Sequence, residues 1–141
     1  MLEIAYDLKY RLLGKYKIET EYDIVTVRQT IRQYAKEAGM GIVDQTRITT
    51  AVSELFRNMY AYAGGGEVRI ESGEVENHEA LIVTCLDEGP GIENLELAMS
   101  DGYTTSSGMG YGLPGAKRLV DRFEIQSEIN VGTTIRLMKW K

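Results

Sequence analysis

The segment Ala80-Leu-Ile-Val-Thr-Cys-Leu-Asp-Glu-Gly-Pro-Gly91 joins an apolar run to a glycine-rich turn. The run Ala80–Leu86 is apolar enough for a strand in the middle of a sheet. A polar stretch, Gly73–Glu79, predicts the turn that connects this run to a partner strand over Glu67–Glu71. We expect this strand pair to form the centre of the sheet.

Two helices are predicted before this strand pair. The first has Asp23 as its expected N-cap and apolar positions at helical spacing as far as Gly39. The second has Asp44 as its expected N-cap and stops at the glycines 64–66. Its apolar stripe consists of Ile48, Ala51, Val52, Leu55 and Met59. The second helix is the longest element that the sequence predicts.

The order of the elements predicts the fold class. The remaining elements are a strand over Lys17–Tyr22, a short helix over Leu95–Met99, a helix from Pro114 to near Arg122, and strands over Phe123–Glu128 and Thr133–Met138. Because strands and helices do not alternate strictly, we expect an α+β two-layer sandwich with helices on one face of the sheet. We expect a single domain over residues 1–141, with residues 1–15 as a mobile leader.

Composition limits the classes of function. The 141 residues carry a net charge of −5, whereas a general nucleic-acid binder needs clustered Lys and Arg. The one cysteine, Cys85, has no partner for an internal disulfide, and no uncharged stretch is long enough to cross a bilayer. We therefore expect a cytoplasmic protein that binds neither nucleic acid nor membrane.

Glu54 and Asn58 are the first candidate site residues. They lie four positions apart on the second predicted helix, so their side chains share one face beside the apolar stripe. This spacing places a carboxylate and an amide at the edge of the core. Taken alone, the pair is more typical of a solvated helix flank.

Asp87 is the second candidate because it follows a buried strand directly. Gly89 and Gly91 would let the backbone of the next turn approach a ligand closely. A carboxylate in this position can accept a hydrogen bond from an exocyclic amine such as that of adenine. The alternative is a type I or type II turn that simply ends the strand.

The third candidate is a glycine-rich loop, Gly108-Met109-Gly110-Tyr111-Gly112-Leu113, which enters a helix at Pro114. Three missing side chains expose backbone N–H groups, and the following helix adds the positive end of its dipole, so the loop is suited to phosphates. Its spacing is neither that of the dinucleotide motif nor that of the P-loop. A flexible connector remains the alternative.

In their order along the chain, these motifs resemble the GHKL superfamily of ATPases and kinases. Glu54–Asn58 is similar to its N box, Asp87–Gly91 to its G1 box, Gly108–Leu113 to its G2 box, and Gly132-Thr133-Thr134 to its terminal Gly-Thr motif. The resemblance implies a Bergerat fold with a mixed, mainly antiparallel sheet. It also implies ATP contacts from Asn58, Asp87, Gly89, Gly91, Gly108, Met109, Gly110, Tyr111, Gly112, Leu113 and Thr133.

The resemblance also implies roles for three residues. Asn58 would coordinate Mg²⁺, Asp87 would bind the adenine amine, and Glu54 would activate the attacking hydroxyl. Tyr62 stands where many anti-sigma kinases of this superfamily have histidine, and the lone His78 is expected to be a solvated turn residue.

A narrower resemblance points to RsbT-type switch kinases of the bacterial stressosome. It rests on Val43–Thr50, Asp101–Ser107 and Gly115–Leu119. It implies ATP-dependent phosphorylation of Ser or Thr on STAS-domain partners, with a phosphatase as a further partner. The alternative is a non-catalytic, ATP-bound module that sequesters a protein, such as an anti-sigma factor. We do not expect the catalytic half of a histidine kinase, because no helices with a phosphoacceptor histidine precede the motifs.

Overall fold

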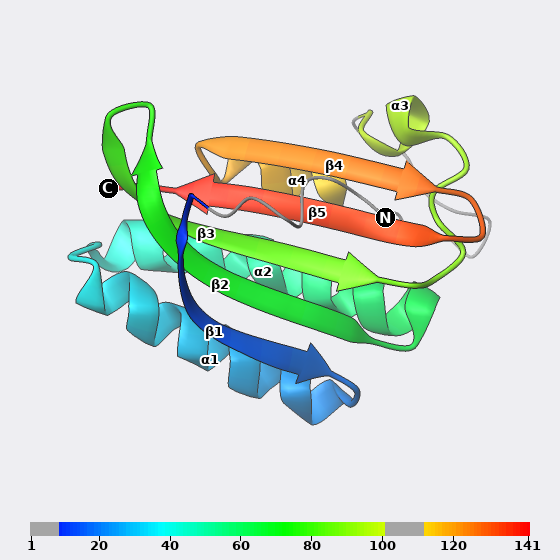
Figure 1. Cartoon of the computed structure of the whole chain (residues 1–141), viewed down its shortest axis with the longest axis horizontal. Coiled ribbons are helices and arrows are strands. Elements are labelled where there is room, and N and C mark those ends of the chain that lie inside the picture. The colour runs from blue at the N-terminus through cyan, green and yellow to red at the C-terminus, as the bar shows by residue number, and fades with distance from the viewer. Residues whose placement is uncertain (1–8, 101–111) are drawn as a thin grey trace.

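The computed structural model describes residues 9–100 and 112–141, which form a sheet covered on one face by helices (Figure 1). The strands are β1 (Arg11–Ile18), β2 (Gly66–Val75), β3 (His78–Asp87), β4 (Arg122–Glu128) and β5 (Gly132–Lys139). The helices are α1 (Glu21–Glu37), α2 (Ile42–Ala63), α3 (Leu95–Ala98) and α4 (Leu113–Arg118). The sheet order is β1-β2-β3-β5-β4, and its four pairings are antiparallel. The predicted α+β sandwich is confirmed, with β3 at its centre.

Both long helices begin slightly earlier than predicted. Thr20, not Asp23, is the N-cap of α1, and Asp23 completes a capping box by accepting the backbone N–H of Thr20 at 3.0 Å. Hydrogen bonds from the Glu19 and Thr20 backbones lower the pKa of the Asp23 carboxyl. Helix α2 follows Gly41 as its N-cap, so Asp44 lies inside the first turn and does not cap the helix. Its end at Gly64, where φ is +76°, agrees with the prediction.

The first strand lies earlier in the chain than predicted. Strand β1 ends at Ile18, residues 19 and 20 connect it to α1, and residues 21 and 22 form the start of that helix instead of extending the strand. Its residues 11–15, expected in a leader, pair with β2, whereas residues 1–8 lie outside the described part of the chain. The alternation of charged and apolar residues predicted the wrong bounds because β1 is an edge strand in which only Ile18 is buried, so its burial pattern is weak.

The β2–β3 hairpin is longer and tighter than predicted. Glu76 and Asn77 form its turn with φ of +51° and +67°, so most of the expected turn Gly73–Glu79 is paired strand. His78 therefore starts β3, where its exposed ring stacks on Trp140 with centroids 4.6 Å apart. Helix α4 also ends at Arg118, short of the predicted Arg122, which already belongs to β4.

The main core lies between the sheet and the long helices. The α2 side chains Ile48, Leu55, Phe56 and Met59 are buried to 2% exposure or less, and they pack with apolar residues of β2, β3 and β5. A smaller apolar cluster on the opposite face contains Ile82 and Met138. Within the described residues, no helix is long and apolar enough to cross a membrane.

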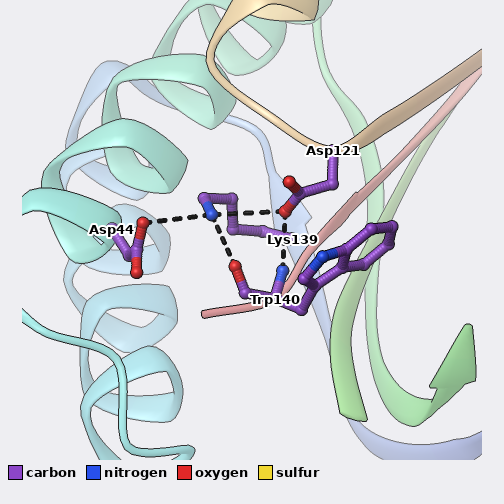
Figure 2. A network of polar contacts seen from close by, with 4 residues as sticks. All are labelled: Asp44, Asp121, Lys139 and Trp140. Atoms are coloured by element: carbon purple, nitrogen blue, oxygen red, sulfur yellow. Dashed lines mark hydrogen bonds and ion pairs between the residues drawn. The ribbon is translucent and has the colours of Figure 1, made fainter. Parts of the chain in front are cut away.

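A buried lysine ties the start of α2 to the last strand (Figure 2). Lys139 Nζ lies 3.1 Å from Asp44 Oδ1 and 3.2 Å from Asp121 Oδ2, and it donates to the Trp140 carbonyl at 2.6 Å. The Trp140 N–H also donates to Asp121, at 2.8 Å. The Lys139 side chain is only 6% exposed, so its charge depends on these partners.

We predict that Lys139→Met destabilises the fold. The substitution removes the cation from between two carboxylates that are themselves partly buried, and we expect the free energy of unfolding to fall by about 2–4 kcal/mol. Urea unfolding measures the change. Lys15→Met, an exposed strand lysine, is the control and should change the free energy by less than about 0.5 kcal/mol. Equal effects of the two substitutions would contradict a structural role for the Lys139 network.

Candidate functional site

A pocket opens between the C-terminal half of α2, the end of β3 and the start of β5. With its open mouth it encloses about 460 Å³. Its apolar lining includes Leu55, Met59, Ile92, Leu113 and Ile135, and its polar lining includes Asn58, Tyr62, Asp87 and Thr133. An apolar slot with a few placed polar groups is typical of small-molecule sites. The structure thus brings five of the predicted site residues, Asn58, Asp87, Gly91, Leu113 and Thr133, to one pocket.

Asp87 ends β3, as predicted, and its carboxylate is held in place by the backbone. Its Oδ1 accepts the N–H of Gly89 at 2.9 Å and the N–H of Thr133 at 3.2 Å. Burial raises the pKa of the Asp87 carboxyl, and these two hydrogen bonds oppose the rise because they favour the charged form. Both bonds use Oδ1, so among the described contacts Oδ2 is left for a donor in the pocket.

Cys85 forms part of the wall beside Asp87. Burial raises the pKa of its thiol, and the nearby Asp87 charge raises it further. Nucleophilic cysteines require the opposite shift, toward the thiolate. Cys85 is therefore a packing residue of the pocket wall.

The glycines after Asp87 are required by protein packing. A Cβ on Gly89 would lie 2.5 Å from the Cβ of Ala63 at the end of α2. Gly91 has φ of +79°, and a Cβ there would lie 2.5 Å from the carbonyl oxygen of Glu128. The loop is thus pressed between α2 and the β4–β5 hairpin. Whether these glycines also let a ligand approach stays a prediction.

Ser127 joins this loop to the hairpin, although no motif of the sequence pointed to it. Its Oγ accepts the Ile92 N–H at 2.7 Å and lies 2.8 Å from Thr133 Oγ1. The only available signal was the position of Ser127 opposite Thr133 across the β4–β5 pair. Ser127 thereby positions Thr133, whose N–H holds Asp87.

Glu54 lies beside the pocket and not in it. It lines an adjoining hollow together with Arg57, while Asn58 lines both spaces. The Glu54 side chain is 35% exposed and forms an ion pair with Arg57. Arg57 was missed, although its spacing three residues after Glu54 could have indicated the pair. Asn58 is thus the link between the pocket and Glu54.

The end of the glycine-rich loop also meets Glu54. Gly112 is the N-cap of α4 with φ of +69°, and a Cβ there would collide with Glu54 Oε2. The next residue, Leu113, lines the pocket. The other predicted loop residues, Gly108, Met109, Gly110 and Tyr111, lie outside the described part of the chain.

The described residues offer no metal cage of their own. In residues 9–100 and 112–141, no three His, Cys, Asp or Glu side chains gather in a metal-binding group. A single amide oxygen such as that of Asn58 is nevertheless a hard ligand suited to Mg²⁺, which usually takes its other ligands from water and substrate phosphates. The donor set fits a metal ion that arrives with a nucleotide.

Comparisons with known proteins agree with this geometry. Residues 43–141 match the family described as histidine kinase-, DNA gyrase B-, and HSP90-like ATPase. The chain is 50% identical over 124 residues to the serine/threonine-protein kinase RsbT of Bacillus subtilis, covering 88% of this chain and 93% of that protein. It is 32% identical over 146 residues to the anti-sigma F factor of Clostridium acetobutylicum, covering 99% and 95%.

A solved structure supports the fold. The catalytic domain of the histidine kinase ThkA superposes with a TM-score of 0.54 at 17% identity, covering 92% of this chain and 97% of that one. At this identity the likeness concerns the fold alone. Together with the sequence relatives, it confirms the predicted GHKL resemblance and the Bergerat fold. The chain belongs to the family of histidine kinase-, DNA gyrase B- and HSP90-like ATPases, among the relatives of RsbT kinases and anti-sigma F factors.

Proposed function

We propose that this chain is a Mg²⁺-ATP-dependent serine/threonine protein kinase that phosphorylates STAS-domain proteins in a bacterial stress-signalling partner switch. The observation that carries the proposal is the position of Asn58, which links the pocket of Asp87 to the open hollow of Glu54. A nucleotide bound at Asp87 would have its phosphates near Asn58, within reach of a hydroxyl that enters the hollow. The 50% identity to a protein named as a serine/threonine kinase supports the same function.

Each residue has a defined task in this proposal. Asp87 accepts the adenine amine through Oδ2, because its Oδ1 already holds two backbone N–H groups. Asn58 would hold Mg²⁺, and the ion would supply positive charge next to the phosphate oxygens. Glu54 orients the hydroxyl of the partner and accepts its proton. The glycine-rich loop over residues 108–113 and Thr133 would contact the nucleotide as well.

The alternative is an ATP-bound module that sequesters a protein without phosphorylating it. The 32% identity to an anti-sigma F factor favours this alternative, since such a protein acts against a sigma factor by its name. Tyr62, which replaces the histidine of many anti-sigma kinases, favours the switch kinase. A switch kinase would bind a STAS-domain antagonist and, after release, a phosphatase, in the cytoplasm. The experiments on Glu54 below separate the two functions.

We predict that Asp87→Asn selectively weakens the binding of adenine nucleotides such as ATP. The substitution keeps an oxygen for the two backbone donors but turns the other group into a donor that faces the adenine amine. We expect a loss of about 1–3 kcal/mol in ATP affinity, measured by calorimetry. Glu88→Gln, at an exposed neighbouring carboxylate, is the control. Equal affinities of the wild type and Asp87→Asn for ATP would remove Asp87 from the site.

We predict that Asn58→Ala abolishes the dependence of ATP binding on Mg²⁺. The amide oxygen is the ligand that the chain provides for the ion, and alanine has none. Titrations of ATP with and without Mg²⁺ measure the difference. Asn94→Ala is the control, because Asn94 caps α3 and does not line the pocket. A mutant at position 58 whose ATP affinity still rises with Mg²⁺ as in the wild type would refute the assignment.

We predict that Glu54→Gln lowers the rate of phosphoryl transfer by about 10²- to 10⁴-fold, because it removes a general base while keeping its shape. ATP affinity and partner affinity should remain close to those of the wild type. The measurement is single-turnover phosphorylation of a STAS-domain partner, with Glu37→Gln, an exposed α1 variant, as the control.

Two outcomes would count against this role. Transfer at the wild-type rate by Glu54→Gln would eliminate Glu54 as the catalytic residue. A wild-type chain that binds ATP and its partner but never transfers phosphate would favour the sequestering module.

A further inference from the structure

A second, polar groove lies between α1 and α2, apart from the nucleotide pocket. With its open mouth it encloses about 600 Å³. Its lining is Arg28, Gln29 and Arg32 from α1, and Thr49, Thr50 and Ser53 from α2. All six side chains are polar, two are cationic and none is acidic. The groove is therefore a positive site on a chain whose net charge is −5.

No acidic residue stands beside the two arginines in the lining of the groove. Arg32 donates to Thr49 Oγ1 at 3.1 Å and to Gln45 Oε1 at 3.5 Å, and both acceptors are neutral. Arg28 is partly buried, and its guanidinium forms no hydrogen bond or ion pair within the part of the chain that the structure describes. Guanidinium groups bind carboxylates and phosphates well, so two arginines in a groove with no acidic lining residue indicate an anionic ligand.

The geometry of the donors favours phosphate among the anions. An arginine presents several N–H donors in a planar fork that matches two oxygens of a phosphate or carboxylate. Here Arg28 and Arg32 line one groove together with the hydroxyl-bearing residues Thr49, Thr50 and Ser53. Such a donor set can surround the three free oxygens of a phosphate monoester, which carries nearly two charges at neutral pH.

The lining excludes a nucleoside as the bearer of that phosphate. The nucleotide pocket has apolar walls, including Leu55, Ile92 and Ile135, against which a purine ring can pack. The polar groove has no aliphatic or aromatic residue in its lining. Its ligand is therefore a phosphate on a small, flexible carrier such as a serine or threonine side chain.

The position of the groove relates it to the proposed reaction. Thr50 lies one helical turn before Glu54, and Ser53 directly precedes it, so the groove adjoins the hollow of the catalytic residue. A partner protein whose hydroxyl enters the hollow would cover the groove with a neighbouring part of its surface. We infer that the groove binds a phosphorylated serine or threonine of the partner protein, so that the kinase senses the phosphorylation state of its own substrate. This inference rests on the proposed kinase function.

The test uses the full chain with its nucleotide pocket filled by a non-hydrolysable ATP analogue. The probes are a short glycine-rich peptide with one phosphoserine, the same peptide unphosphorylated, and inorganic phosphate. Proton–nitrogen NMR spectra follow the side-chain Nε–H signals of Arg28 and Arg32 during each titration and give the dissociation constants. We expect the phosphopeptide to shift both signals, inorganic phosphate to bind more weakly, and the unphosphorylated peptide to shift neither.

A pair of variants makes the assignment specific. Arg28→Gln should weaken phosphopeptide binding at least about tenfold, because it removes a charge-assisted hydrogen-bonding group. Arg47→Gln, which removes an exposed α2 arginine outside the groove, should leave the dissociation constant unchanged. Equal losses in the two variants would show that only the general charge matters, and would overturn the inference.

Three other results would overturn the inference, and one separates it from the proposed function. Absence of phosphopeptide binding would overturn it, as would binding that occurs only when the ATP analogue is left out, because the peptide would then occupy the nucleotide pocket. Inorganic phosphate that binds as tightly as the phosphopeptide would assign the groove to free phosphate and not to a protein partner. If the groove binds the phosphopeptide but the chain never transfers phosphate from ATP, the groove is supported and the kinase function fails alone.

Discussion

Burial of the apolar stripe of α2 against the sheet is the constraint on which the site depends. Ile48, Leu55 and Met59 are almost fully buried, so the helix cannot rotate about its axis without exposing them. Asn58 directly precedes Met59 and is thereby fixed at the edge of the core, where it faces the end of β3. The same burial that stabilises the fold thus brings an amide of α2 and the Asp87 carboxylate to one pocket.

Contacts at both ends also fix the position of α2 along its axis. At its start, Asp44 is held by the buried Lys139 of β5, and the same lysine holds Asp121 before β4 (Figure 2). At its far end, the helix packs so tightly that a Cβ on Gly66 would lie 2.6 Å from the sulfur of Met59. The buried stripe therefore limits rotation of α2 about its axis, and the contacts at its two ends limit movement of the helix along that axis. A site built on such a helix is positioned more accurately than one built on loops alone.

The distribution of charge explains how an acidic chain can serve anionic ligands. In the pocket, backbone N–H groups of Gly89 and Thr133 hold Oδ1 of the Asp87 carboxylate, so its Oδ2 is left for a donor on the ligand. In the groove between the long helices, Arg28 and Arg32 supply positive charge, and the lining contains no acidic residue. Local arrangement, and not the net charge of −5, decides what each surface can bind.

The sequence by itself determined α1, α2, β3 and the place of Asp87 at the end of a buried strand, because helical periodicity, glycine stops and an apolar run are local signals. It misplaced β1, an exposed edge strand, and the tight turn at Glu76 and Asn77, which lacks the usual glycine. Only the tertiary structure showed that Asp44 forms an ion pair with Lys139 and that Ser127 accepts a hydrogen bond from the loop after Asp87. It also showed that Glu54 lines a hollow beside the pocket. These roles depend on contacts between segments that are far apart in the sequence. Local sequence patterns do not reveal such contacts, because they form only when the core packs.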